Sequence, residues 1–490
     1  MRNKTLKWLS VALTPLAVIA GCSTGGGTTT TSSTSQSVAP IAPPMTITLD
    51  SSIDDWPAGE VAVGDEYYLY VRFSPGASIT PQSNDESVVI SLDTDDSKLT
   101  GLDGTDLEIS FSPPRDDGRP GNGTRVAAFS PDGERLTIAP ALLDISISPS
   151  HASEWFELRI ARQMTSDGIL PVNGLLGSGK IRGRLAMYNN AGKRVAEAPE
   201  FSAVLPQAAP NVKLVRTSLP SKSLGSVRIV SYNVLNAAPL DNPEPFSRML
   251  RALDPDIVLV QEWYDTPADE MGAWFNRHLP ISGRWRAVTG EGRGVAVISR
   301  LDLAPIGPPG LVIQPEGEDR TVRVMPAIAE TPIGTMAVAS VHLKCCGSLD
   351  SREDRLRIAE SEAIATLIES ETRDIGPHVR VVAGDFNLVG GKEPLYSMAS
   401  SLDVDNTSAS VAEPFVLGDN AMYTWTSPTS RFLPSRLDYA VYSDASAVLE
   451  RSFVFDPARL SDESLKALNL NRIDAMASDH RPLVVDLRAP

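Results

Sequence analysis

The chain has 490 residues, of which 42% are hydrophobic and 21% are charged. This balance is ordinary for folded protein and excludes disorder of the whole chain, and the length leaves room for two domains and a linker. The formal net charge is −17. Because Lys and Arg supply most non-specific affinity for a nucleic-acid backbone, this charge argues against a tight nucleic-acid binder, although a bound divalent metal can neutralise a target phosphate locally.

The N-terminus has the pattern of an export signal. Basic residues precede an apolar run at 9–20, which is shorter than the roughly 20 apolar residues that span a bilayer. The next motif, Ile19-Ala-Gly-Cys22, resembles the lipobox of bacterial lipoproteins, which implies that Cys22 is lipidated. We expect residues 1–22 to be a signal peptide with its lipobox, and the protein to be exported and lipid-anchored to the cell envelope, on its periplasmic or cell-surface face. An uncleaved transmembrane helix is the alternative.

Two segments are predicted to be connectors. Residues 23–45 consist almost entirely of Ser, Thr, Gly and Pro, a composition that buries little apolar area and serves as a flexible tether. Residues 206–225 contain three prolines and little periodicity, which indicates an interdomain linker.

Residues 46–205 are predicted to form an all-β sandwich domain. Short strands with alternating apolar residues are separated by turn residues, a pattern typical of antiparallel sandwiches. The predicted strands are Tyr67–Phe73, Ser87–Leu92, Asp106–Phe111, Trp155–Ile160 and Lys180–Tyr188.

The same region resembles the carbohydrate-binding-like modules of secreted bacterial enzymes, on the pattern Ile53-Asp-Asp-Trp56, Ser91-Leu-Asp93-Thr-Asp95-Asp96 and Glu154-Trp-Phe-Glu157. The resemblance implies polysaccharide as a partner, with a structural spacer as the alternative. Ca²⁺ takes oxygens from closely spaced carboxylates. A calcium ion or a solvated hairpin is therefore expected at Asp93, Asp95, Asp96 and Asp103.

Residues 226–490 alternate apolar runs with helix-like stretches. Helical spacing predicts helices over Pro245–Leu253, Ala268–Leu279 and Ser351–Glu371. The apolar, β-branched runs between them are typical of buried strands.

Polar motifs follow these apolar runs. They therefore fall at strand ends, where α/β proteins build active sites on a rigid sheet. In chain order they are Ser-Tyr-Asn233, Val-Gln-Glu262, Ser-Val-His342, Gly-Asp385-Phe-Asn387, Arg436-Leu-Asp438-Tyr and Ser-Asp479-His480.

Together these motifs resemble the endonuclease/exonuclease/phosphatase superfamily, which includes deoxyribonuclease I. The resemblance covers residues 227–488 and implies an α/β four-layer sandwich, in which two packed β-sheets are flanked by helices. It also implies a metal-dependent hydrolase acting on phosphoester bonds. Each motif alone is weak, because patterns as short as Asp-His or Gly-Asp-Phe-Asn recur by chance. Glu262 would also suit a helix cap, and Asn233 a turn.

By this resemblance Glu262 is the principal ligand of Mg²⁺. A carboxylate at the end of a buried strand is costly without a cation or hydrogen-bond partners. Asn233 offers both a carbonyl oxygen and an amide donor, so we expect it to contact the metal and the substrate phosphate. Asp479 is expected to complete the metal shell or the water network. Hard oxygen ligands favour Mg²⁺ or Mn²⁺ over zinc.

Asp385 and Asn387 lie two apart on a segment predicted to be extended, which would point both side chains to one side. We expect Asp385 to orient and deprotonate the attacking water, and Asn387 to hold that water or the substrate phosphate. An Asx turn at Asp385 is the structural alternative.

Two histidines complete the predicted catalytic set. His480 is expected to donate to a non-bridging phosphoryl oxygen as charge builds in the transition state, with Asp438 fixing its tautomer. His342 matches the superfamily's other active-site histidine, which contacts phosphate, and Glu291 is the nearest residue that could orient it.

We therefore predict an extracytoplasmic, monomeric, Mg²⁺-dependent phosphoesterase that hydrolyses phosphodiester bonds, with a nuclease as the leading hypothesis. One alternative is a phosphatase or phosphodiesterase on small or lipid phosphates; the other is a non-catalytic, glycan-binding surface lipoprotein. The loops that would select a substrate carry no clear signal.

Cys345 and Cys346 are adjacent and directly follow His342-Leu-Lys344. In an oxidising compartment they could form a vicinal disulfide that stiffens this loop. Two unpaired thiols are the alternative.

Overall fold

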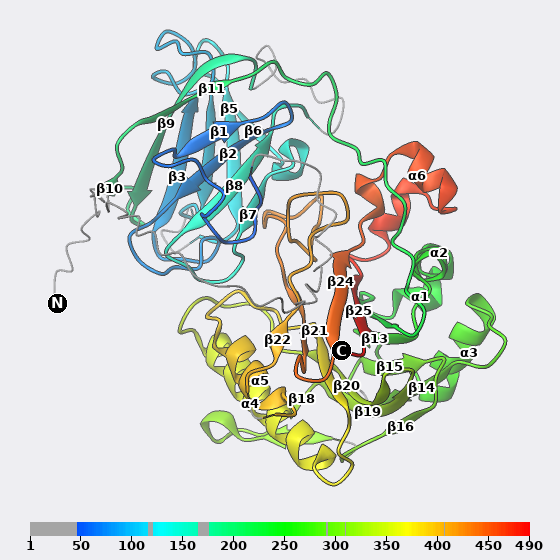
Figure 1. Ribbon diagram of the computed structural model, residues 1–490. Coiled ribbons are helices and arrows are strands. Elements are labelled where there is room, and N and C mark those ends of the chain that lie inside the picture. Colours follow the sequence, from blue (N-terminus) through cyan, green and yellow to red (C-terminus); the bar gives the residue numbers. More distant parts are fainter. Residues whose placement is uncertain (1–46, 116–120, 165–175, 291–292, 309, 406) are drawn as a thin grey trace, which may run out of the picture.

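The computed structural model describes residues 47–115, 121–164, 176–290, 293–308, 310–405 and 407–490. The predicted signal peptide with Cys22, the tether and Glu291 lie outside these residues. Two bodies of structure are visible in Figure 1, an all-β body coloured blue to teal and a mixed α/β body coloured green to red. Within the described ranges, no helix combines the length and the apolar character that crossing a membrane requires.

The all-β body is a sandwich of two antiparallel sheets, which agrees with the predicted alternation of apolar residues. Its strands are β1 (Ala62–Gly64), β2 (Tyr68–Phe73), β3 (Ser87–Asp93), β4 (Leu107–Phe111), β5 (Thr124–Phe129), β6 (Arg135–Ile138), β7 (Ser146–Ser148), β8 (Phe156–Ala161), β9 (Gly179–Tyr188), β10 (Arg194–Glu197) and β11 (Phe201–Leu205), with the 3-10 helix η1 (Pro140–Leu143) between β6 and β7. The sheet orders are β1-β2-β8-β7 and β10-β9-β3-β4-β5-β6, and β11 pairs with β9. Leu69 and Leu158 of one sheet and Ile90 and Ile109 of the other belong to one buried core.

The α/β body contains two six-stranded sheets. The first has the order β14-β15-β13-β12-β25-β24 and the second the order β16-β19-β20-β21-β23-β22, and β17 pairs with β18 in a hairpin. The strands are β12 (Val227–Asn233), β13 (Ile257–Gln261), β14 (Arg286–Thr289), β15 (Val295–Ser299), β16 (Leu303–Pro305), β17 (Leu311–Ile313), β18 (Arg320–Val322), β19 (Val324–Thr331), β20 (Gly334–His342), β21 (Val379–Asp385), β22 (Ser410–Val411), β23 (Asp438–Tyr442), β24 (Val448–Val454) and β25 (Leu483–Arg488).

Helices cover the outer faces of these two sheets. They are α1 (Ala238–Asp241), α2 (Pro243–Leu253), α3 (Ala268–His278), α4 (Arg352–Thr372), α5 (Glu393–Leu402) and α6 (Asp462–Ala467), with short 3-10 helices η2 (Pro315–Gly317), η3 (Pro457–Arg459) and η4 (Arg472–Met476). Helices α2 and α3 pack on the first sheet, where Phe246 and Trp274 lie in one core with Val258. Helices α4 and α5 pack on the second, where Ile364 shares a core with Val382. The predicted four-layer sandwich is therefore confirmed.

A buried arginine joins the two bodies. Arg159 of β8 is fully buried, and its guanidinium donates to Asp419 at 2.5 and 3.0 Å and also to the side-chain oxygen of Asn420. Arg459 lies 3.3 Å from Asp419 and donates to Asp144 of the sandwich at 2.6 Å. Burial alone would raise the pKa of Asp419, but the two guanidinium groups lower it overall.

We expect the substitution Arg159→Ala to lower the free energy of unfolding by about 3–5 kcal/mol, because it leaves the buried Asp419 charge without its main partner. Urea denaturation followed by circular dichroism measures this. The matched control is Arg135→Ala, since Arg135 pairs with Glu108 at 3.1 Å on the surface of the same sandwich and its side chain is 43% exposed. The control should cost at most about 1 kcal/mol. Equal losses in the two variants would contradict this account.

Candidate active site

The pleat of the strands places three of the predicted residues between the two sheets. Side chains alternate between the faces of a strand, so residues separated by an even number of positions share a face. Ile229, Val338 and Val381 lie in the core between the sheets. The residues four positions further along the same strands are Asn233, His342 and Asp385.

Parallel pairing brings these strand ends to one edge. Strand β12 runs parallel to β13, and β20 runs parallel to β21 with His342 opposite Asp385. Gly384 lies in this pair with a φ of +156°, and a Cβ added to it would lie 2.0 Å from the carbonyl oxygen of Val341. A glycine is therefore required where the two strands approach most closely.

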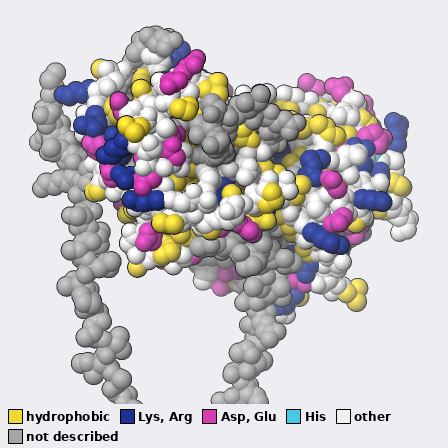
Figure 2. All heavy atoms as spheres, turned by 90° about the horizontal axis from the view of Figure 1, so that it is seen from above, with side chains coloured by type: hydrophobic (Ala, Val, Ile, Leu, Met, Phe, Trp, Pro, Cys, Tyr) yellow, Lys and Arg dark blue, Asp and Glu magenta, His cyan; other side chains and the backbone are white. Residues whose placement is uncertain are grey.

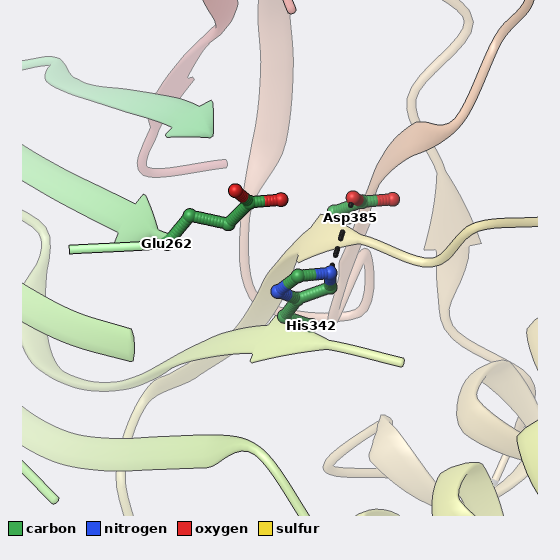
Figure 3. Close-up of side chains that lie close together, drawn as sticks. All are labelled: Glu262, His342 and Asp385. Carbon is green, nitrogen blue, oxygen red and sulfur yellow. Dashed lines mark ion pairs between the residues drawn. The ribbon is translucent and has the colours of Figure 1, made fainter. Parts of the chain in front are cut away.

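Three side chains at this edge could hold a metal ion. One ligand atom from each of Glu262, His342 and Asp385 lies within 4.8 Å of the others. Figure 3 shows the three side chains converging from three different strand ends. Two carboxylates and an imidazole form a donor set suited to a divalent cation, and the residues present therefore fit such an ion. The sequence paired Glu262 with Asn233 and Asp479 as ligands, and that pairing stays a prediction.

Asn233 lies between the two carboxylates. Its amide nitrogen donates to Glu262 at 3.1 Å and to Asp385 at 3.2 Å, while its carbonyl oxygen accepts from the backbone N–H of Leu235 at 3.1 Å. In this arrangement Asn233 acts as a donor that holds both carboxylates in place, and its own oxygen is occupied by the backbone.

His480 and Asp438 form the pair expected from the sequence. The Nδ1 atom of His480 lies 2.8 Å from Asp438, and its Nε2 atom lies 3.7 Å from Asp385. Burial alone would lower the pKa of His480, but Asp438 and Asp385 outweigh burial and raise this pKa to about 10. The imidazole is therefore held as a cation whose Nε2–H faces the centre of the site.

Asp385 is almost completely enclosed. It is 2% exposed, and burial raises its pKa to about 7 despite the opposing effect of His480. Its carboxylate also accepts from the backbone N–H of Asn387 at 2.9 Å. A general base is most effective when its pKa lies near the operating pH, so this environment suits a residue that accepts a proton from water.

His342 is held in its neutral form. Burial, followed by Arg323 and His480, lowers its pKa well below the usual value. Its Nε2 atom lies 3.5 Å from Asp385, and its buried Nδ1 atom has no hydrogen-bond partner among the described residues. A neutral imidazole with an unpaired nitrogen can serve as a ligand or as a donor to a phosphate oxygen.

The predicted extended conformation at Asn387 is wrong. Asn387 has a φ of +49°, in the left-handed region, and its N–H bonds to the Asp385 carboxylate two residues earlier. This is the Asx turn that was the structural alternative. The turn directs the Asn387 amide to the carbonyl oxygen of Leu343 at 3.2 Å, where it links the loops that follow β20 and β21.

Asp479 lies outside the group of potential metal ligands. It is partly buried, and its carboxylate accepts from the indole nitrogen of Trp425 at 2.9 Å. It also contributes to the raised pKa of His480. In the structure, Asp479 therefore links Trp425 to the neighbourhood of His480.

Sequence reasoning missed two residues beside the site. Arg323, at the start of β19, donates to the carbonyl oxygen of Leu343 at 2.9 Å, and its own carbonyl oxygen accepts from the N–H of His342 at 3.0 Å. The phenol of Tyr264 lies 3.5 Å from the Arg323 guanidinium. In the sequence these residues are only an arginine and a tyrosine close to strand ends. Such placements are common, so they did not mark the two residues as part of a site.

Cys345 and Cys346 are free thiols in the structure, with 2.9 Å between their sulfur atoms. The hydrogen bond from Cys346 lowers the pKa of Cys345 to about 5, assisted by Lys344. The alternative of unpaired thiols is the one observed here.

In the sandwich, a second acidic group contains two of the four residues predicted for calcium. Ligand atoms of Asp93, Asp95 and Asp106 lie within 4.8 Å of one another. Asp96 instead pairs with Arg182, and Asp103 does not belong to the group. Ca²⁺ binding there stays a prediction.

A comparison with protein families assigns the α/β body. The model of the endonuclease/exonuclease/phosphatase family matches residues 230–480. The chain belongs to this family, and the protein is accordingly a hydrolase of phosphoester bonds. No curated protein matches the chain.

Several solved structures are similar to the chain. They include a 3'-5' exonuclease from Neisseria meningitidis (18% identity, TM-score 0.36, 54% of this chain and 100% of that chain). An AP endonuclease from Archaeoglobus fulgidus has 19% identity and a TM-score of 0.35 over 53% of this chain and 98% of that chain. The human Nocturnin catalytic domain with bound sulfate has 18% identity and a TM-score of 0.34 over 56% of this chain and 96% of that chain.

We expect Asp438→Asn to lower kcat by about 10²–10⁴-fold, the range for losing a positioned acid or base, because the variant no longer holds His480 as a cation in its orientation. Steady-state hydrolysis of bis(p-nitrophenyl) phosphate with a divalent metal measures this. Asp444→Asn is the control, since Asp444 is exposed just beyond the opposite end of β23. A rate loss in the control equal to that of Asp438→Asn would contradict the assigned role.

Proposed function

We propose that the protein is an extracytoplasmic, Mg²⁺-dependent phosphodiesterase, with nucleic acid as its leading substrate. The observation that supports this most directly is the convergence of Glu262, His342 and Asp385 opposite the Asp438–His480 pair. These groups provide cation ligands, a base and a hydrogen-bond donor around one point. Hydrolysis at phosphorus requires this combination, because its main demands are positioning and charge stabilisation.

Each residue has a defined task in the proposed reaction. Asp385 orients a water molecule for in-line attack and accepts its proton. His480 donates from Nε2 to a non-bridging phosphoryl oxygen, and Asp438 keeps that imidazole protonated and oriented. His342 donates to a second phosphate oxygen. The attacking water displaces the alcohol in one step, so no covalent enzyme intermediate forms.

Glu262 would hold the metal ion as its principal ligand, at a position close to Asp385 and His342. When bound, Mg²⁺ or Mn²⁺ polarises the phosphoryl group and offsets its negative charge. Asn233 contributes by fixing the two carboxylates through its amide group, and it is placed to donate to phosphate when a carboxylate moves. The carboxylate donors favour these hard cations.

The distribution of surface charge is compatible with two substrate classes, nucleic acid and small or lipid phosphates. On the face shown in Figure 2, Lys and Arg side chains are interleaved with Asp and Glu, and the net charge is −17. A nuclease with such a surface would bind its substrate mainly through the metal site and residues near it, such as Arg323. A small or lipid phosphate needs few contacts beyond the phosphate, and the acidic composition favours it as the second candidate.

A substrate panel distinguishes these candidates. Purified residues 46–490 would be incubated with Mg²⁺ and plasmid DNA, RNA, nucleotides, inositol phosphates or phospholipid vesicles, and the products identified by mass spectrometry. We expect cleavage of DNA or RNA, which should disappear in Glu262→Ala. Calorimetry of the same variant should show weaker Mg²⁺ binding, by more than the 10–100-fold typical of losing a residue behind a metal ligand.

The carboxylate control is Glu330→Gln, because Glu330 is exposed on β19 and its carboxylate accepts only from the hydroxyl of Thr335 among the described residues. Turnover of small or lipid phosphates alone would select the second candidate. Absence of any turnover would contradict the proposed function and favour the non-catalytic, glycan-binding interpretation.

We also propose that Cys22 carries the lipid that anchors the protein to the cell envelope. The support is the lipobox-like Ile19-Ala-Gly-Cys22 after a basic and apolar leader. In a bacterial host, Cys22→Ser should abolish incorporation of labelled palmitate and move the protein from the membrane fraction to the soluble fraction. Cys346→Ser is the matched control and should leave both properties unchanged. Retention of palmitate in Cys22→Ser would contradict the anchor.

A further inference from the structure

Three loops that surround the site rest on the β-sandwich. We name them by the strands they adjoin: the β20 loop (343–351) follows His342, the β21 loop (386–392) follows Asp385, and the β23 loop (424–437) precedes Asp438. Each forms hydrogen bonds with buried residues of the sandwich. A domain that served only as a spacer would not need to contact all three.

A single hydroxyl group joins the first two loops. Thr80 is 4% exposed. Its hydroxyl donates to the carbonyl oxygen of Val389 at 2.9 Å and accepts from the backbone N–H of Leu349 at 3.0 Å. The strand pairing and the Asn387–Leu343 bond join these loops where they leave His342 and Asp385. Thr80 joins them again further along, at Leu349 and Val389, and ties both to the sandwich. Next to it, the N–H of Ala152 donates to the carbonyl oxygen of Gly390 at 2.8 Å.

Two further sandwich residues hold the β23 loop. The side-chain oxygen of Gln82 accepts from the N–H of Leu433 at 2.8 Å and from the hydroxyl of Thr124 at 2.9 Å. The hydroxyl of Ser150 accepts from the N–H of Arg436 at 2.6 Å. Gln82 is 7% exposed and Ser150 8% exposed, so water does not replace these bonds easily.

The β23 loop in turn contacts the catalytic pair. The hydroxyl of Thr424 accepts from the backbone N–H of Asp438 at 2.9 Å, and Trp425 forms a β-bridge with His480. The indole of Trp425 also binds Asp479. Movement of this loop would therefore displace both members of the Asp438–His480 pair.

We propose that the β-sandwich is a working part of the active site, in which Thr80, Gln82 and Ser150 act as positioning residues for the catalytic side chains. Thr80 is the central one, because its hydroxyl ties the β20 loop to the β21 loop. None of the three touches the reacting phosphate. They act through the backbone of the loops, and the sandwich thereby supports the loops that flank the strand-paired residues His342, Asp385 and Asp438.

The test compares two substitutions at one position in the full mature chain. Thr80→Val keeps the shape and removes the hydroxyl, whereas Thr80→Ser keeps the hydroxyl. Displacement of catalytic groups by about 1 Å can cost about 10²-fold in rate, so we expect Thr80→Val to lower kcat by about 10–100-fold with little change in KM. Thr80→Ser should restore most of the rate. The assay is Mg²⁺-dependent hydrolysis of bis(p-nitrophenyl) phosphate.

Thr105→Val is the matched control. Thr105 is 7% exposed in the same sandwich, and its hydroxyl accepts from Arg184 of β9 at 3.4 Å. The variant loses a buried hydroxyl of the same kind and should show a similar change in melting temperature with kcat unchanged. Equal kcat in Thr80→Val and Thr105→Val, or failure of Thr80→Ser to restore the rate, would overturn the proposal.

The kcat comparison rests on the proposed phosphodiesterase activity. A second measurement therefore distinguishes a failure of the positioning role from a failure of the proposed function. Hydrogen–deuterium exchange should become faster in the β20 and β21 loops of Thr80→Val and stay unchanged there in Thr105→Val. Unchanged exchange in Thr80→Val would overturn the positioning role even in an active enzyme. Faster exchange in these loops of Thr80→Val, together with a wild-type protein that hydrolyses no phosphodiester, would support the positioning role and reject only the proposed function.

Discussion

The burial of negative charge between two sheets is the constraint on which the rest of the site depends. Asp385 and Asp438 lie opposite each other in adjacent strands and are 2% and 1% exposed. Burial disfavours the ionised form of Asp385, and the nearby Asp438 carboxylate adds to that cost. The His480 imidazole, the Asn233 amide and the N–H of Asn387 each supply positive charge or donated protons to this pocket. A divalent cation beside Glu262 would offset the remaining negative charge of the carboxylates.

The sequence predicted the architecture well because strands and helices are marked by patterns among neighbouring residues. Apolar runs with polar residues at their ends located the strands of the site, and helical spacing located α2 and α3 to within two residues at either end. The pairing of Asp438 with His480 was expected from the superfamily resemblance, and the two side chains do lie together.

Other features were not decided by the sequence pattern. Residues 385–387 allowed both an extended strand and a turn, and the turn forms because the Asn387 N–H donates to the Asp385 carboxylate two residues earlier. The role of Thr80 was hidden because its contacts are long-range. A threonine in a turn-rich segment has no distinguishing pattern, and its partners Leu349 and Val389 come from a distant part of the chain. Long-range packing decides such cases.

Glu262 has a φ of +62°, a conformation that L residues with a Cβ adopt only at a cost of about 1–3 kcal/mol. Glycine or asparagine would relieve this strain, yet a carboxylate stands there. The chain therefore maintains a locally unfavourable backbone at the residue that faces the metal position. Mutational drift that improves folding would tend to remove this side chain first. A glutamate retained at this position in other sequences would consequently report selection for hydrolysis, since stability alone would select against it.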